Sequence, residues 1–247
     1  MLEGLLDSEK AKQFITPLND IISVGITEKI LINILDDCIK ISSTTPNKSN
    51  YFILKYKKEF LEGFNLPSVP FNFGVKDLTE LVGIMRAFSD GFKIKIEDKI
   101  LTLSNGDSTF TYYGCNENHC IRGPKNVDTE TGLLAAFKWD DALKPFTKAI
   151  GQLKDQEHVV FSGNKDDMKT NLMVTNEQFK RYNNFCSRTQ STKVTQTFRK
   201  ITDKKIMLPV VTSSIDEFLV KIFNDNIMFM GKSDAFNIIH MVSTKVK

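Results

Sequence analysis

The 247-residue chain is 41% hydrophobic and 26% charged with a formal net charge of +3 at pH 7, which is typical of a soluble globular protein. No run approaches the ~18 apolar residues of a membrane-spanning helix, and the N-terminus has neither the basic region nor the apolar stretch of a secretory signal. The four scattered cysteines exclude a disulfide-rich framework and predict a reducing, cytoplasmic location, whereas the mild charge neither demands nor excludes a polyanionic partner.

The first part of the chain predicts two helices set among short strands. Ser8 is expected to cap a helix over 8–23, in which Pro17 should bend the helix or end a segment of it. Asp77 is expected to cap a second helix over 78–88. Strands are predicted from β-branched and aromatic runs at 30–34, 38–42, 51–56, 92–97, 100–104 and 108–113.

A polar stretch separates this part from the next. Residues 115–132 contain Gly123, Pro124 and many charged or amide side chains, so they are predicted to form an inter-domain connector. The connector divides the chain into a first domain at 1–114 and a second at 133–247.

The second domain is predicted to contain the same kinds of element. Helices are expected over 140–153 and 214–223. Residues 176–192 have no counterpart in the first domain, and we interpret them as an inserted loop or short helix. Strands are predicted near 158–162, 169–175, 193–200, 226–231 and 235–243.

The two halves repeat one pattern. Apolar residues occur at the same helical spacing over 14–22 and 142–150, with a proline at the same register, and a second similarity links 71–85 with 208–222. A repeat of this kind favours an architecture built by symmetry over one built around a catalytic cleft. The predicted fold class is α+β, with two helices packed on antiparallel sheets in each domain.

The outward faces of the predicted helices carry scattered Lys and Arg. Basic side chains without base-reading geometry attract phosphate independently of sequence. The same residues also fit ordinary solvated helix faces, and the faces alone do not decide between these interpretations.

Signals for catalytic or metal chemistry are weak. Cys115 and Cys120 enclose Glu117 and His119, but their spacing is not that of a paired metal ligand and no second pair follows, so a loop with two thiols is the better interpretation. The run 231–233 lacks the first glycine of a phosphate-binding loop, and the acidic pairs lie in turns or at a helix start. The sequence therefore predicts no enzyme, no catalytic residue, no metal and no cofactor.

Two adjacent segments resemble a known family. They are 71–85 (Phe-Asn-Phe-Gly-Val-Lys-Asp-Leu-Thr-Glu-Leu-Val-Gly-Ile-Met) and the hairpin at 92–106 (Phe-Lys-Ile-Lys-Ile-Glu-Asp-Lys-Ile-Leu-Thr-Leu-Ser-Asn-Gly). A strand that leads into Asp-Leu-x-x-Leu-hydrophobic-Gly and then a charged hairpin resembles the DNA sliding clamps, and most closely those of T-even-type bacteriophages, the DNA polymerase accessory proteins. The resemblance covers nearly the whole chain at the level of topology, but individual residues are similar only over 71–113. The stretch at 176–192 and the mild positive charge depart from the family pattern.

The resemblance implies a duplicated clamp fold and a non-enzymatic function. Subunits would assemble head-to-tail into a closed homotrimer, and duplex DNA would thread through the ring without sequence readout. The clamp would tether a viral replicative DNA polymerase in the cytoplasm of an infected host, with a clamp loader and the other subunits as further partners. The residues implied to face DNA are Lys12, Lys76, Arg86, Lys144, Lys148 and Lys221.

The resemblance also implies two protein contact surfaces. Ser108–Tyr113 of one subunit would pair with Val194–Arg199 of the next, because exposed strand edges need partners. The implied interface residues are Phe110, Tyr112, Val194 and Phe198. The implied pocket for partner peptides near the connector comprises Ile121, Leu133, Met241, Val242 and Val246.

Two alternatives remain open at this stage. One is a clamp-like scaffold that tethers transcription or recombination factors. The other is a duplicated α+β nucleic-acid enzyme or binding protein that does not form a ring, and a monomer at every concentration would favour it. The lack of an asymmetric polar cluster argues against an enzyme, and the scarcity of strands that combine aromatic and basic residues argues against a single-strand binder.

Overall fold

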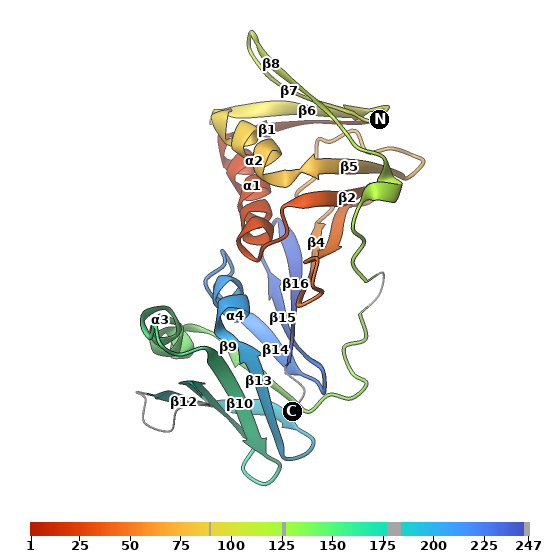
Figure 1. The fold of residues 1–247 in the computed structure, drawn as a ribbon. Helices are drawn as coiled ribbons and strands as arrows, with labels where there is room; N and C mark the ends of the chain where they lie inside the picture. Colours follow the sequence, from red (N-terminus) through yellow and green to blue (C-terminus); the bar gives the residue numbers. More distant parts are fainter. Residues whose placement is uncertain (89, 125–126, 177–183, 245–247) are drawn as a thin grey trace. The chain divides into compact units, whose positions relative to one another are not determined.

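The computed structural model describes residues 1–88, 90–124, 127–176 and 184–244. Within them the chain is α+β, with antiparallel sheets and four α-helices (Figure 1). It divides into two compact units. Unit 1 comprises Met1–Thr45, Tyr51–Lys125 and Ser233–Ile238, and unit 2 comprises Pro46–Asn50, Asn126–Lys232 and Ile239–Lys247.

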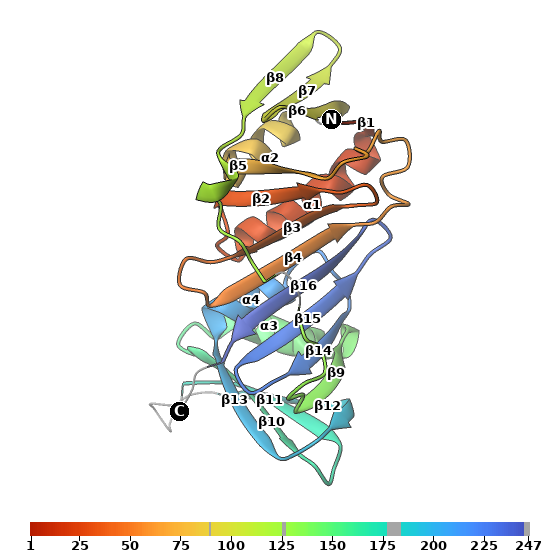
Figure 2. The ribbon, with the colours of Figure 1, turned by 90° about the vertical axis from the view of Figure 1, so that its right-hand side faces the viewer.

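Unit 1 contains two antiparallel sheets and two helices. The sheet in the order β1-β6-β7-β8 consists of β1 (Leu2–Asp7), β6 (Gly91–Glu97), β7 (Ile100–Asn105) and β8 (Ser108–Tyr113). The sheet in the order β4-β3-β2-β5 consists of β4 (Asn50–Tyr56), β3 (Ile39–Thr44), β2 (Glu28–Ile34) and β5 (Phe71–Asp77). The helices α1 (Ser8–Ser23) and α2 (Leu78–Ala87) pack on each other and on these strands, and Figure 2 shows β2, β3 and β4 on one side of α1.

Unit 2 repeats this set of elements. Its strands are β9 (Ala135–Trp139), β10 (His158–Asn164), β11 (Lys169–Thr175), β12 (Phe185–Val194), β13 (Phe198–Asp203), β14 (Phe218–Ile222) and β15 (Asn226–Lys232), paired in the order β13-β10-β11-β12-β9-β14-β15. A short 3-10 turn, η2 (Asp141–Leu143), leads into α3 (Lys144–Gln152), and α4 (Lys204–Val211) follows β13. The last strand is β16 (Phe236–Ser243), which begins in unit 1 and ends in unit 2.

An aspartate marks each place where a strand leads into a helix. It ends or directly follows the strand, its backbone is extended, and its carboxylate accepts a backbone N–H of the first helical turn, as an N-cap does. The caps are Asp7 on Lys10 N (2.8 Å), Asp77 on Glu80 N (3.0 Å), Asp140 on Ala142 N (3.0 Å) and Asp203 on Lys205 N (2.8 Å). The prediction for Asp77 is confirmed, whereas Ser8 as the cap of the first helix is wrong because Ser8 already lies inside α1.

Most predicted elements of the first domain are confirmed, but β1 was missed. Only Leu2 and Leu6 of its apolar residues are buried, and this alternation is too short to stand out in the sequence. Helix α1 continues through Pro17 without ending there. Two helix carbonyl oxygens before the proline accept hydrogen bonds from side-chain hydroxyls. Thr16 Oγ1 donates to Lys12 O (2.7 Å), and Tyr56 OH donates to Phe14 O (2.5 Å).

Three predictions for the second domain are wrong. The helix expected at 214–223 is absent, and the strand β14 occupies its second half. Phe218, Val220 and Ile222 are buried and alternate with more exposed residues, so the period is that of a strand between β9 and β15. The second helix of this domain is α4, which starts earlier.

The predicted insertion and the strand after it are also misplaced. From Phe185 onward the expected loop at 176–192 is the strand β12, while 177–183 lie outside the described residues. The strand expected at 193–200 spans the end of β12, a connection at 195–197 and the start of β13. Six residues of β12 alternate in burial but are mostly polar, so the strand carries little hydrophobic signal. None of the described helices is both long enough and apolar enough to cross a membrane.

Candidate nucleic-acid interface

Helices α1 and α2 of unit 1 present basic side chains on their exposed surface. Lys12 of α1 and Arg86 of α2 are exposed, while the opposite faces of both helices are buried. Both residues line a groove of about 390 Å³ between the two helices. Arg86 Nη2 donates to Asn19 Oδ1, which holds the guanidinium across this groove. The groove therefore has a polar, positively charged rim.

Lys76, which the resemblance implies to face DNA, lies on a strand rather than on a helix. It is an exposed residue of β5, directly before the cap residue Asp77. The backbone N–H groups of both residues donate to the hydroxyl of Tyr112, at 2.9 Å each. Its position one residue before the cap places it near the start of α2 rather than on the face of that helix.

Helix α3 of unit 2 carries Lys144 and Lys148 on its exposed side. Lys144 Nζ lies 2.8 Å from the carboxylate of Asp141. The hydrogen bond to this carboxylate raises the pKa of Lys144, so its ammonium remains charged but is partly neutralised by its neighbour. Both groups of the pair are well exposed, so the pair is open to exchange for another anion.

The assignment of Lys221 is wrong. The residue belongs to β14 rather than to a helix, and its side chain is only 11% exposed. Its Nζ lies 2.6 Å from Glu130 Oε1 and donates to Thr129 O at 2.9 Å. Lys221 therefore fastens the end of the predicted connector to β14.

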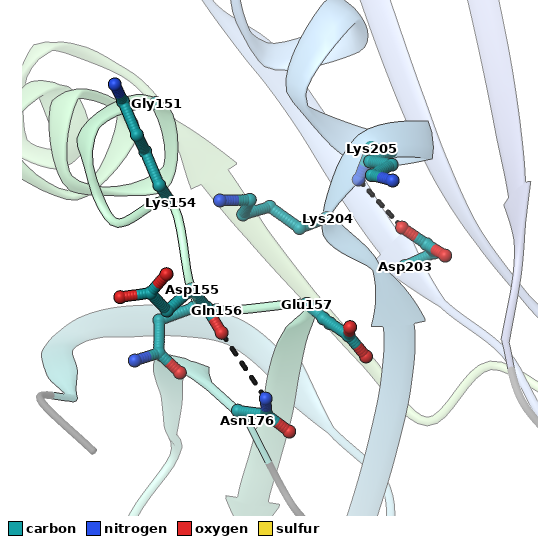
Figure 3. Close-up of a pocket in the computed structure, with 9 residues that line it drawn as sticks. All are labelled: Gly151, Lys154, Asp155, Gln156, Glu157, Asn176, Asp203, Lys204 and Lys205. Atoms are coloured by element: carbon teal, nitrogen blue, oxygen red, sulfur yellow. Dashed lines mark hydrogen bonds between the residues drawn. The ribbon is translucent and has the colours of Figure 1, made fainter.

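A cleft of about 860 Å³ lies beside α3 and α4 and was not anticipated (Figure 3). Lys204 reaches across from the start of α4 to donate from Nζ to Leu153 O at 2.5 Å, and burial lowers the pKa of this ammonium. Lys205 is exposed beside it. The nine residues that line the cleft are Gly151, Lys154, Asp155, Gln156, Glu157, Asn176, Asp203, Lys204 and Lys205.

The basic residues of this cleft were missed because the last helix was predicted too late in the chain. The available signal was Asp203, which follows a β-rich run as Asp7 and Asp77 do. Three acidic residues also line the cleft, so it is not uniformly positive.

Two exposed helical glycines pack against none of the other residues that the structure describes. A Cβ added to Gly83 of α2 or to Gly151 of α3 would meet nothing within 4 Å. Glycine inside a helix costs roughly 0.5–1 kcal/mol relative to alanine. Since none of the described neighbours requires a glycine there, these residues leave room above the exposed faces of both helices.

Of the two strand edges predicted to form the subunit interface, only one is present in the structure. β8 is an edge strand of its sheet, and Phe110 on it is half-buried. Tyr112 is 6% exposed, and its hydroxyl already binds the end of β5, so its side chain is not available to a neighbour. Val194 pairs with Ala135, and Phe198 opens β13, so 194–199 is not one strand and the predicted pairing segment is wrong.

The residues predicted to form the peptide pocket do not all lie at a surface. In unit 1, Ile121 N donates to Lys29 O at 2.6 Å. In unit 2, Leu133 is 6%, Met241 8% and Val242 0% exposed. A side chain with no exposed area cannot contact a partner, so Val242 is wrong as a pocket residue. Val246 lies outside the described residues.

The described part of the chain contains no group of three or more His, Cys, Asp or Glu side chains that could hold a metal ion. No protein-family model and no curated protein matches the sequence.

Solved structures match the whole chain. A. fulgidus PCNA, in a structure with the C-terminal region of FEN-1 bound, has a TM-score of 0.77 and 14% identity, and the match covers 100% of this chain and 99% of that one. The fold is that of the PCNA clamps. Thermococcus kodakaraensis PCNA has a TM-score of 0.77 at 10% identity, covering 99% and 100%, and Entamoeba histolytica PCNA has 0.72 at 13%, covering 99% of each chain.

The match confirms the predicted α+β, duplicated clamp fold. The similar structures named here are archaeal and eukaryotic clamps, so the particular closeness to T-even-type phage clamps stays a prediction. Identities of 10–14% carry the fold and leave the function to be argued from the residues.

Proposed function

We propose that the chain is a subunit of a ring-shaped sliding clamp that encircles duplex DNA and tethers a DNA polymerase for processive synthesis. The observation that carries this proposal is the clamp fold over the full length of the chain, together with basic residues on exposed helix faces in both units. In this function the protein is a scaffold without catalytic activity, as the sequence predicts.

The internal duplication supports a closed ring. Within unit 1, Lys57 N donates to Ala235 O just before β16, and within unit 2, Ser243 N at the end of β16 donates to Ser49 O, each at 2.9 Å. Each bond joins residues of a single unit, one just before β16 and the other at its end. The counterparts of β16 and β4 in the duplication are β8 and β12.

The matching edges within one chain are unpaired among the described strands. β8 is the end of its sheet, and β12 pairs with β11 over Phe185–Gln190 but with β9 only from Ser191 onward. An exposed edge of this kind requires a partner. We place Ser108–Tyr113 of one subunit beside Phe185–Gln190 of the next, which replaces the segment expected from sequence. A heterologous contact that closes on itself gives a ring, for which we propose three subunits.

The DNA-facing surface is proposed to be the exposed side of the helices. The residues that would attract phosphates are Lys12, Arg86, Lys144 and Lys148. We add Lys205, an exposed residue of α4, to this set. Lys76 remains a candidate near the start of α2, whereas Lys221 is excluded by its bonds to 129–130. Contacts of this type are independent of sequence and weaken with salt, which permits sliding.

Partner proteins are proposed to bind through short peptides near the connector. A. fulgidus PCNA binds the C-terminal region of FEN-1 in its structure, and this chain covers 99% of that protein. We retain domain 1 at 1–114, the connector at 115–132 and domain 2 at 133–247, with Ile121 of unit 1 and, separately, Leu133 and Met241 of unit 2 as candidate peptide contacts. The proposed partners are a DNA polymerase and a clamp loader. In its more specific form, the proposal is that the polymerase is that of a phage and that the clamp acts in the cytoplasm of the infected host.

The assembly can be tested by light scattering and DNA retention. We expect a species near three times 28.1 kDa at high concentration. After loading, the protein should remain on closed circular DNA and leave when the circle is linearised, because a ring holds DNA by topology. A monomer at all concentrations, or equal retention on circular and linear DNA, would contradict the proposal.

Charge reversal tests the helix faces separately from assembly. Lys144→Glu with Lys148→Glu should weaken DNA retention while the trimer persists. The matched control reverses Lys58 and Lys165, two exposed lysines outside the helices, with the same change in net charge. Equal losses in both double variants would place the effect in overall charge rather than in α3.

A further inference from the structure

The structure brings the two thiols of the connector together. Cys115 Sγ and Cys120 Sγ lie 3.6 Å apart, on either side of the 3-10 turn η1 (Glu117–His119). Both side chains are half-buried, and both belong to unit 1. The sulfurs are therefore already in contact, although the sequence spacing suggested no paired function.

Glycine at position 74 makes room for this pair. A Cβ at Gly74 would lie 3.0 Å from each sulfur and 2.5 Å from Cys115 O. Cys115 N also donates to Gly74 O at 2.9 Å, which anchors the first cysteine to β5. The backbone of β5 thus forms the floor on which the two thiols meet.

The turn between the cysteines is fastened to the same sheet. Glu117 Oε2 accepts from Asn72 Nδ2 at 2.7 Å and lies 3.6 Å from Arg122 Nη2. Cys120 N donates to Glu117 O at 3.1 Å, which closes the turn. These bonds limit how far either sulfur can move away from the other.

We propose that Cys115 and Cys120 form a reversible thiol–disulfide site that fastens the start of the connector in the oxidised state. The bond requires the sulfurs to approach from 3.6 Å to about 2.0 Å, a movement within reach of side-chain rotation. The site goes beyond DNA binding, since it lies just after the edge strand β8 and would fix the position where that strand ends.

The oxidation is balanced with hydrogen peroxide as the oxidant. One thiol is oxidised to a sulfenic acid, and peroxide is reduced to water. The second thiol then attacks the sulfenic sulfur and the S–S bond forms. The hydroxyl of the sulfenic acid takes the proton of the second thiol and leaves as a second water. A low-molecular-weight dithiol reverses the step by exchange and is itself oxidised.

A step that uses the Cys120 thiolate should be slow at neutral pH. Burial, with the neighbouring Cys115 sulfur, raises the pKa of the Cys120 thiol to about 12. Since the thiolate is the reactive form, oxidation should accelerate as the pH rises.

The test uses the full chain with peroxide, followed by denaturation, thiol titration and peptide mapping. A peptide pair linked through Cys115 and Cys120 should appear, and at least two of the four thiols per chain should be lost. Cys38 and Cys186 serve as internal references, one buried and one exposed. Dithiothreitol should restore all four thiols.

Two variants and a second probe keep the test decisive. Cys115→Ser and Cys120→Ser should each abolish the linked peptide. We also expect oxidation to raise the thermal stability of the original chain but not that of either variant. Phenylarsine oxide, which bridges close thiols, should bind the reduced chain and neither variant. The proposal is overturned if the two cysteines oxidise separately, or link chiefly to Cys186 of another chain.

Discussion

The two halves of the molecule share their element order but differ in the segments that join the elements. In the first half, 57–70 connect β4 to β5, whereas in the second only 195–197 connect β12 to β13. Conversely, β12 is longer than β4, and α3 is shorter than α1 and preceded by η2. What both halves retain is the aspartate-capped joint from strand to helix. The repeat is therefore preserved in its element order and helix caps rather than in the lengths of its elements and connections.

An aromatic side chain with a polar tip secures the first helix of each half. Tyr56 OH donates to Phe14 O in unit 1, and Trp139 Nε1 donates to Thr147 Oγ1 (3.2 Å) in unit 2. Different residues at different points of the repeat thus perform one task, which a comparison of aligned residues would overlook.

The largest effect should come from truncating the helix residue that fills each core. Phe14 is 5% and Phe146 0% exposed. Phe14→Ala and Phe146→Ala should each lower the free energy of unfolding by about 3–5 kcal/mol, because each leaves a cavity. Denaturant titration would measure this, with exposed Val69→Ala as a control that should change little. A clearly smaller loss in one half would break the equivalence of the helices.

Acid should destabilise unit 2 through His240, which is buried in that unit. Burial lowers the pKa of His240 from 6.5 to about 3, so it stays neutral when folded and protonates on unfolding. Its stabilisation is full above 6.5 and falls as the pH drops toward 3, by at most about 1.4 kcal/mol per pH unit.

This dependence can be followed in unit 2 alone. Trp139, the one tryptophan of the chain, reports by fluorescence on that unit. In His240→Leu the slope of stability against pH between 6.5 and 3 should be reduced. An unchanged slope would remove His240 as the cause.

Loss of a helix cap should have a medium effect of equal size in both halves. Asp77→Ala and Asp203→Ala each leave a first-turn N–H without its acceptor, and each should cost about 1 kcal/mol of unfolding free energy. Glu59→Ala, on an exposed loop, is the control. If only one cap matters, the aspartate joint is not the shared feature of the repeat.

The smallest predicted effect has the opposite sign. Gly83→Ala and Gly151→Ala should each stabilise the chain by roughly 0.5–1 kcal/mol, since the added methyl meets nothing. Thermal melting would measure the gain, and DNA retention would show whether the methyl obstructs a ligand. Destabilisation would mean that the glycines serve the fold after all.

The sequence by itself determined the parts of the molecule whose physics is local. Asp77 next to an apolar helix period predicts a capped helix, and the runs at 100–104 and 108–113 predict the strands β7 and β8, because each pattern has one good solution. The resemblance over 71–113 added the fold, which the structural match confirms.

Only the tertiary structure decided elements whose patterns fit two periods or lie far apart in sequence. Residues 218–222 suit a helix or a strand, and pairing with β9 and β15 on both sides selects the strand. As part of this strand, Lys221 forms an ion pair with Glu130. The hydroxyl of Tyr112 likewise accepts a hydrogen bond from the backbone at the end of β5. Such outcomes depend on which strands meet across the chain, so the energy that decides them appears only after the sheets have formed.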